Sequence, residues 1–336
     1  MKRLVWLDDA KTIGIFLVIL AHTQIWSSVT DWISVFRMPL FFFMSGFLFS
    51  FQRNPDRKVF IRKRFYQIVI PYILINIITY LFWLLVSRHY GVSVGEEDIV
   101  WYSPIKAMLL CNGKEMVHNI PLWFLLCLFI VEVMYYTLFK HLSQVQRWAL
   151  TAVFALLGYI NYKFIPFVLP FSLGTAFVGM IFYSIGYEVS KHIENCHVSS
   201  VWRVVLLLAS TAVVTYFSVV NERVYLYCNH YGNYLIFLLA ALCGIIMMYL
   251  FTSLLAKWLG QQHIIEYISK NTLTICGFHL MIYTLLKGVA VYIIGLQLET
   301  FNGTILPNII LAAVGMAICC AIACFLERYC PIVLGK

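Results

Sequence analysis

The chain has 336 residues, of which 62% are hydrophobic and only 12% are charged, and its formal net charge is +9. A soluble domain has roughly 45–50% apolar and 25% charged residues, so this composition excludes an ordinary soluble globular protein. The positive charge does not predict a nucleic-acid partner, because the lysines and arginines lie between long apolar runs, as they do in membrane proteins.

A transmembrane helix needs about 20 mostly apolar residues, and ten stretches of the chain approach that requirement. The sequence therefore predicts an all-α integral membrane protein, a bundle of about ten transmembrane helices. No long linker or internal repeat divides it, so we expect a single domain over residues 1–336. The expected spans are 12–30, 33–52, 66–87, 119–139, 147–163, 167–190, 201–221, 232–255, 270–295 and 304–328.

The distribution of basic residues predicts the orientation of the chain in the membrane. Most of the 24 lysines and arginines fall in connections on the side that holds the N-terminus, and cytoplasmic connections are the ones enriched in these residues. An even number of spans then places both termini in the cytoplasm. The long outer connection, about 88–118, contains an apolar stretch that we expect to form a short helix on the membrane or over a pocket.

The first span carries the leading catalytic candidates, because ionisable groups within membrane helices are costly and mark functional sites. Lys11 and His22 are eleven residues apart, which returns a helix nearly to the same face, and Asp8 lies on that face within pairing distance of Lys11. A buried neutral histidine suits general-base catalysis, although a lone histidine is often only structural.

Basic side chains supply candidates for binding substrate and acyl donor. Arg37 lies within the second span; it suits holding a sugar hydroxyl, a carboxylate or an oxyanion, and the alternative is a guanidinium that reaches the outer headgroups. The cytoplasmic cluster that includes Arg62, Lys63 and Arg64 suits either anionic lipid or the phosphates of coenzyme A.

Further substrate-binding candidates lie in later spans. Glu132 could orient a histidine or bind a sugar hydroxyl, and His279 is the second candidate for the site, with a structural role equally open. Asn271 lies near the cytoplasmic rim below His279. Trp123 could stack on a sugar ring or belong to an interfacial aromatic belt. The ten cysteines include no C-x-x-C pair, so we expect small buried hydrophobic residues and no metal site.

At these residues the chain resembles the acyltransferase-3 family of bacterial membrane O-acyltransferases, most of all its fucose-4-O-acetylase-like branch. The similarity consists of motifs in the family's order, beginning with Leu7, Asp8, Lys11 and His22. Many relatives carry arginine at the position of Lys11, and many close relatives carry histidine at the position of Arg37. The later motifs are FRMPLFFFMSG (36–46), RKR (62–64), LWFLLCLF (122–129), PFSLGTAFVGMIFYSIGYEV (170–189) and NTLTICGFH (271–279).

The resemblance implies transfer of an acetyl group from cytoplasmic acetyl-CoA to a hydroxyl of a cell-surface or lipid-linked carbohydrate, in the bacterial cytoplasmic (inner) membrane. It implies that His22 is essential and that Lys11 cooperates with it. Direct transfer and an acetyl-histidine intermediate both fit. The alternative function is a transporter, flippase or exporter of a lipid-linked sugar or exopolysaccharide; the oligomeric state is not predicted.

Overall fold

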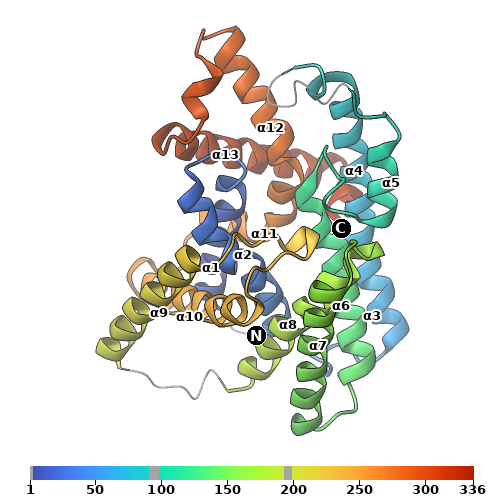
Figure 1. Ribbon diagram of the computed structural model, residues 1–336, viewed down its shortest axis with the longest axis vertical. Coiled ribbons are helices and arrows are strands. Elements are labelled where there is room, and N and C mark those ends of the chain that lie inside the picture. Colours follow the sequence, from blue (N-terminus) through green and yellow to red (C-terminus); the bar gives the residue numbers. More distant parts are fainter. Residues whose placement is uncertain (1–2, 91–97, 193–198) are drawn as a thin grey trace.

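The computed structural model describes residues 3–90, 98–192 and 199–336, and throughout these ranges the regular structure is helical (Figure 1). The only extended pairing among them is an isolated bridge between Tyr225 and His230. The all-α prediction is therefore confirmed. The α-helices are α1 (Val5–Leu20), α2 (Ser27–Leu48), α3 (Arg57–Arg64), α4 (Ile70–Phe82), α5 (Ser103–Leu110), α6 (Trp123–Phe139), α7 (Gln144–Phe164), α8 (Leu173–Ser190), α9 (Ser200–Val220), α10 (Tyr234–Leu259), α11 (His263–Lys270), α12 (Thr272–Tyr292) and α13 (Leu306–Tyr329).

Seven helical segments among the described residues are long and apolar enough to cross a membrane. Each coincides with one of the ten expected stretches. The other three stretches contain α1, α7 and α8, which are helical but fall short of the same length or hydropathy requirement. The total of about ten spans stays a prediction. The spanning segments are Ser27–Leu48, Arg57–Ser87, Ile120–Phe139, Ser200–Val220, Tyr234–Leu259, Thr272–Tyr292 and Leu306–Tyr329.

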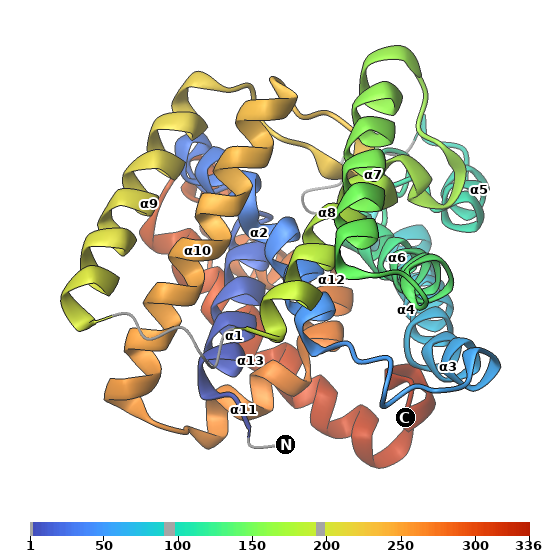
Figure 2. The ribbon, with the colours of Figure 1, turned by 90° about the horizontal axis from the view of Figure 1, so that it is seen from below.

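Helices α1 and α2 lie at the centre of the bundle, with α9 and α10 on one side and α3, α4, α6 and α7 on the other (Figures 1 and 2). The contact between α2 and α8 depends on two glycines. A Cβ atom on Gly46 would lie 1.9 Å from the backbone oxygen of Tyr183, and one on Gly186 would lie 2.1 Å from that of Phe43. The backbones touch directly, as small residues allow in membrane helices.

The first expected span, 12–30, is wrong in its extent. Helix α1 already ends at Leu20, residues 21–24 form a turn, and α2 begins at Ser27. The strongly apolar run ends at Leu20, and the polar residues His22, Thr23 and Gln24 that follow it form the turn. As a consequence, His22 lies in the turn after α1 and not on the helix itself.

Between Arg57 and Ser87 the helix is continuous but widens at Phe65–Val69 into a π-helical turn, η1. The N–H of Ile70 bonds to the oxygen of Phe65, five residues earlier. Pro71 explains the widening, because it has no N–H to offer and its ring crowds the carbonyl four residues earlier. The irregular turn directly follows Arg64, which lines the cavity described below.

The start of α1, α3, α11 and the C-terminus lie at one end of the molecule (Figure 2). Thr12 Oγ1 donates to the oxygen of Ile265 in α11 at 3.0 Å, which ties the start of α1 to that end. This end holds the basic cluster of α3. The common location of the chain ends agrees with an even number of spans, and the cytoplasmic assignment of this end stays a prediction.

Candidate functional site

A cavity of about 590 Å³ runs through the middle of the bundle. Its walls come from α1, α2, α3, α6 and α12, together with residues 224–227 of the connection between α9 and α10. Its volume is typical of a pocket for a small ligand or cofactor. Many of the side chains singled out from the sequence meet here: Lys11, His22, Arg37, Lys63, Arg64, Glu132 and Trp123.

Lys11 and His22 both line this cavity, one from α1 and the other from the turn that follows it. The sequence predicted that both side chains lie on one face of a single helix. In the structure Lys11 lies on α1 and His22 on the turn after it, and both border the same cavity. Since the end of α1 brings the imidazole to the cavity wall, the two residues still reach a common ligand.

His279 lies directly behind His22, with ring centroids 5.3 Å apart, and it is fully buried. Its Nδ1 lies 3.0 Å from the oxygen of Ile275 and 2.9 Å from that of Cys276, so Nδ1 carries the proton and donates it to this backbone. Nε2 is then an acceptor, and among the described residues it has no partner. His279 does not line the cavity itself, and its expected contact with substrate stays a prediction.

A buried lysine holds the turn that carries His22. Lys287 is 2% exposed, and its Nζ donates to Oε1 of Gln24 at 2.8 Å. The backbone oxygen of Gln24 accepts from the N–H of Gly303 at 3.0 Å. Gln24 has a φ of +72°, a conformation that costs free energy for a residue with a side chain. These contacts fix an otherwise strained turn beside the candidate base.

Basic side chains collect at the α3 end of the cavity. Lys63, Arg64 and Arg53 line this end of the cavity. The remaining candidate of the cluster, Arg62, does not line it and lies over the ring of Tyr66. Arg53 was not selected from the sequence; its place in the cationic run after the second span was the available signal.

Glu132 is paired, and this decides its role. Its two carboxylate oxygens accept from Nε and Nη2 of Arg64, the second at 2.6 Å, in a bidentate ion pair. Arg64 also donates from Nη1 to Oε1 of Gln67 at 2.8 Å. Glu132 is 4% exposed, so Arg64 holds it as a buried partner. The histidine contact expected for Glu132 is not formed.

Residues 224–227 form part of the cavity wall, and they belong to segment 222–231 between α9 and α10, here called the cap segment. None of the described residues of 88–118 lines the cavity, while Tyr225 and Tyr227 do. The expected short helix in 88–118 exists as α5, but it packs elsewhere: the hydroxyl of Tyr72 donates to the oxygen of Met108 in α5 at 2.6 Å. Residues 91–97 lie outside the described ranges.

The cap segment is anchored to two helices and is also paired with itself. Thr175 of α8 donates to the oxygen of Leu226 at 2.7 Å, and the backbones of Tyr225 and His230 exchange two hydrogen bonds. Arg223 forms an ion pair with Asp31 of α2 at 3.1 Å. The sequence analysis missed this segment. The available signal was its density of tyrosines between two strongly apolar spans.

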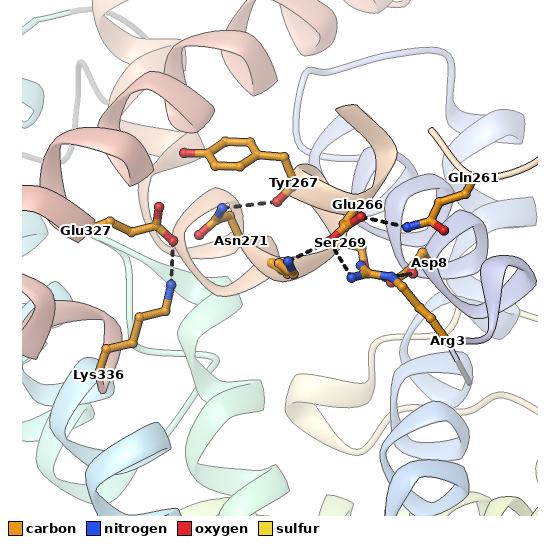
Figure 3. A network of polar contacts seen from close by, with 10 residues as sticks. Arg3, Asp8, Gln261, Glu266, Tyr267, Ser269, Asn271, Glu327 and Lys336 are labelled. Atoms are coloured by element: carbon orange, nitrogen blue, oxygen red, sulfur yellow. Dashed lines mark hydrogen bonds and ion pairs between the residues drawn. The ribbon is translucent and has the colours of Figure 1, made fainter. Parts of the chain in front are cut away.

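Two further candidates, Asp8 and Asn271, also lie outside the cavity, in a polar network at the start of α1 (Figure 3). Asp8 accepts from Nε of Arg3 and from Oγ of Ser269, each at 2.6 Å, so the expected hydrogen-bonded pair with Lys11 is replaced. Asn271 donates to the oxygen of Tyr267 at 3.1 Å and is 3% exposed. Both side chains fix α11 and the start of α12 beside the site.

The arrangement combines one imidazole near the middle of a cavity, cations at one end and aromatic rings at the other. No group of three or more histidine, cysteine or acidic side chains with metal-binding geometry occurs in the described ranges. A family model described as an acyltransferase domain matches residues 4–325, whereas no curated protein and no solved structure matches the chain. Since the match covers nearly the whole chain, the protein belongs to the acyltransferase-3 family and is a membrane acyltransferase.

Proposed function

We propose that the protein is an O-acetyltransferase of the bacterial inner membrane, which moves an acetyl group from cytoplasmic acetyl-CoA to a hydroxyl of a cell-surface or lipid-linked carbohydrate. The observation that carries this proposal is the single cavity that joins a cationic end, an imidazole and an aromatic end. One substrate enters from each end, and the two meet at His22.

The cationic end suits the donor. Coenzyme A carries several phosphate charges, and Arg53, Lys63 and Lys11 offer positive side chains on the cavity wall. No carboxylate in the described part of the chain is hydrogen-bonded to any of the three. Arg64 adds a guanidinium whose charge is balanced by Glu132. The phosphates bind at this end, and the pantetheine arm extends along the cavity until the thioester reaches His22.

His22 acts as the general base. Its ring nitrogen takes the proton of the acceptor hydroxyl while that oxygen attacks the thioester carbonyl carbon. The tetrahedral intermediate then collapses: the carbon–sulfur bond breaks, and the CoA sulfur leaves with the proton that the imidazolium returns. Both substrates held in one water-poor cavity add the advantage of proximity.

Two residues position this base. Nε2 of His279 has a free lone pair beside the ring of His22, so it is available to accept the N–H of His22, which would leave the other ring nitrogen of His22 unprotonated. Lys287 holds the turn through Gln24. Neither residue contacts substrate in this mechanism.

The test uses purified protein in lipid nanodiscs with acetyl-CoA labelled in the acetyl group, and it measures label on saccharide together with free CoA. We expect His22→Ala to lower transfer by at least about 100-fold, the contribution typical of general-base catalysis. The matched control is His141→Ala, a change at an exposed histidine outside the cavity. Near-normal transfer by folded His22→Ala protein would contradict the proposal.

A further inference from the structure

We propose that the acceptor is an anionic sugar, which Arg37 binds through a carboxylate or phosphate beneath the cap segment. This inference deepens the proposed function and rests on it. The juxtaposition behind it is a guanidinium with no counter-charge among the described residues, together with His22 and two tyrosines, on the wall of one cavity.

Arg37 lines the cavity from α2, and its Nη1 is buried without a hydrogen-bond partner among the described residues. No carboxylate in those ranges forms an ion pair with it. A buried guanidinium costs free energy unless an anion pairs with it. The described residues supply no such anion, so we assign that role to the ligand.

The nearby carboxylates are already engaged. Asp31, on the same helix as Arg37, is paired with Arg223, and Glu132 is paired with Arg64. Glu132 is also the one acidic side chain on the described cavity wall, where Lys11, Arg37, Arg53, Lys63 and Arg64 supply the positive charge. The donor's phosphates neutralise the α3 end, and Arg37, which projects from the middle of α2, is left for the second substrate.

The surroundings of Arg37 suit a sugar ring. Trp123 and Tyr227 approach each other closely: a Cβ on Gly113 would lie 3.2 Å from Cβ of Trp123 and 2.9 Å from that of Tyr227. Both side chains, with Tyr225, line the cavity. Flat aromatic faces bind the apolar face of a sugar, while a guanidinium fixes a carboxylate or phosphate through two parallel hydrogen bonds.

Arg37 also lines the same cavity as His22. An anion bound to Arg37 therefore lies near the candidate base, and a hydroxyl on the same sugar is presented to His22. The bound anion would offset the positive charge that forms on the imidazole when it takes the proton.

The experiment measures sugar binding without acyl transfer. Wild-type protein in nanodiscs is saturated with coenzyme A, so that the donor end is occupied, and is titrated with methyl glucuronide, glucose 6-phosphate or methyl glucoside. We expect at least one of the two anionic sugars to bind about tenfold more tightly than methyl glucoside, the effect of a charge-assisted hydrogen bond. A preference for glucuronide identifies a carboxylate, and a preference for the phosphate ester identifies a phosphate.

Arg37→Gln should remove this preference, and Arg37→Lys, which keeps the charge but loses the two-pronged geometry, should retain part of it. Arg328→Gln, a change at an exposed arginine far along α13, is the matched control and should retain all of it. Equal binding of the three sugars, or binding of none, overturns the inference. An unchanged preference in Arg37→Gln overturns it as well.

The two proposals fail separately. If His22→Ala retains transfer while wild-type protein still prefers the anionic sugar, the general-base mechanism is wrong and the acceptor site stands. If Arg37→Gln slows hydrolysis of acetyl-CoA without any sugar and no anion preference exists, Arg37 acts on the thioester, and the acceptor inference is wrong.

Discussion

The polar network at the start of α1 and the central cavity contain similar side chains but differ in how completely these are paired. In the network, Glu266 accepts from Arg3 at 2.5 Å, from Lys270 at 2.7 Å and from Gln261 at 3.0 Å, and Asp8 accepts from two further donors (Figure 3). In the cavity, Nη1 of Arg37 and, just behind the wall, Nε2 of His279 have no partner among the described residues.

The difference separates structural charges from functional ones. A group with all its hydrogen bonds made inside the protein stabilises the fold and has little left to offer a ligand. A buried polar group that lacks hydrogen bonds within the protein lowers the stability of the fold. Such a group is expected where a bound ligand supplies the missing partner. Three changes and one contrasting variant test this distinction.

The largest effect is expected at the pair of Glu132 and Arg64. Glu132→Gln removes the charge that balances a largely buried guanidinium, and we expect the free energy of unfolding to fall by about 2–3 kcal/mol, less than for a fully enclosed pair because Arg64 faces the cavity. Denaturant unfolding in detergent measures it. The double change Glu132→Gln with Arg64→Gln should recover part of the loss.

Arg37→Gln gives the contrast to that measurement, because it removes a charge that has no ion-pair partner among the residues the structure describes. The free energy of unfolding without ligand should be unchanged or higher by about 1 kcal/mol. If Arg37→Gln lowered the free energy of unfolding as much as Glu132→Gln does, Arg37 would be paired within the protein. The distinction between structural and functional charges would then be wrong.

At neutral pH a smaller effect is expected at His118, in the connection before α6. Its Nε2 lies 2.9 Å from Oδ1 of Asn76, whose amide donates to the oxygen of Tyr72, so His118 Nε2 donates and its Nδ1 is left without a partner. Burial lowers the pKa of His118 from 6.5 to about 4. Between about pH 4 and pH 6.5, His118 is therefore protonated in the unfolded chain but neutral in the folded protein.

Stability should then fall with pH below about 6.5, and the loss should level off near pH 4, with a slope of about 1.4 kcal/mol per pH unit within that window. His118→Gln keeps a donor toward Asn76 and should flatten this part of the profile. An identical pH profile in the variant would show that His118 does not titrate in this way. Thermal unfolding between pH 4 and 7 measures both.

The smallest effect is expected at Glu266 in the exposed network. Hydrogen bonds from Lys270 and Gln261, together with the charge of Arg3, lower the pKa of Glu266 from 4.5 to about 2. Its contribution to stability is present above about pH 4.5 and is lost as the pH falls toward 2. Glu266→Gln should remove this acid dependence, and added salt should mimic the change by screening. Salt-independent behaviour would contradict this assignment.

Much of the fold follows from local properties of the chain. Long apolar runs predict helices without reference to the rest of the molecule, and each expected stretch contains one. The boundary at Leu20 was missed although polar residues follow it, because the reversal there is held by Lys287 and Gly303, which lie far along the chain. The cap segment was missed for a related reason: no local pattern says which loop covers a cavity.

The sequence by itself determined that this is a helical membrane protein of the acyltransferase-3 family with costly ionisable groups in apolar surroundings, because hydropathy and motif order are properties of neighbouring residues. Only the tertiary structure decided which of those groups share a cavity and which are already paired. Asp8 and Glu132 look equally functional in the sequence, yet each is held by partners from other helices. Pairing depends on distances between helices, and no single stretch of sequence contains them.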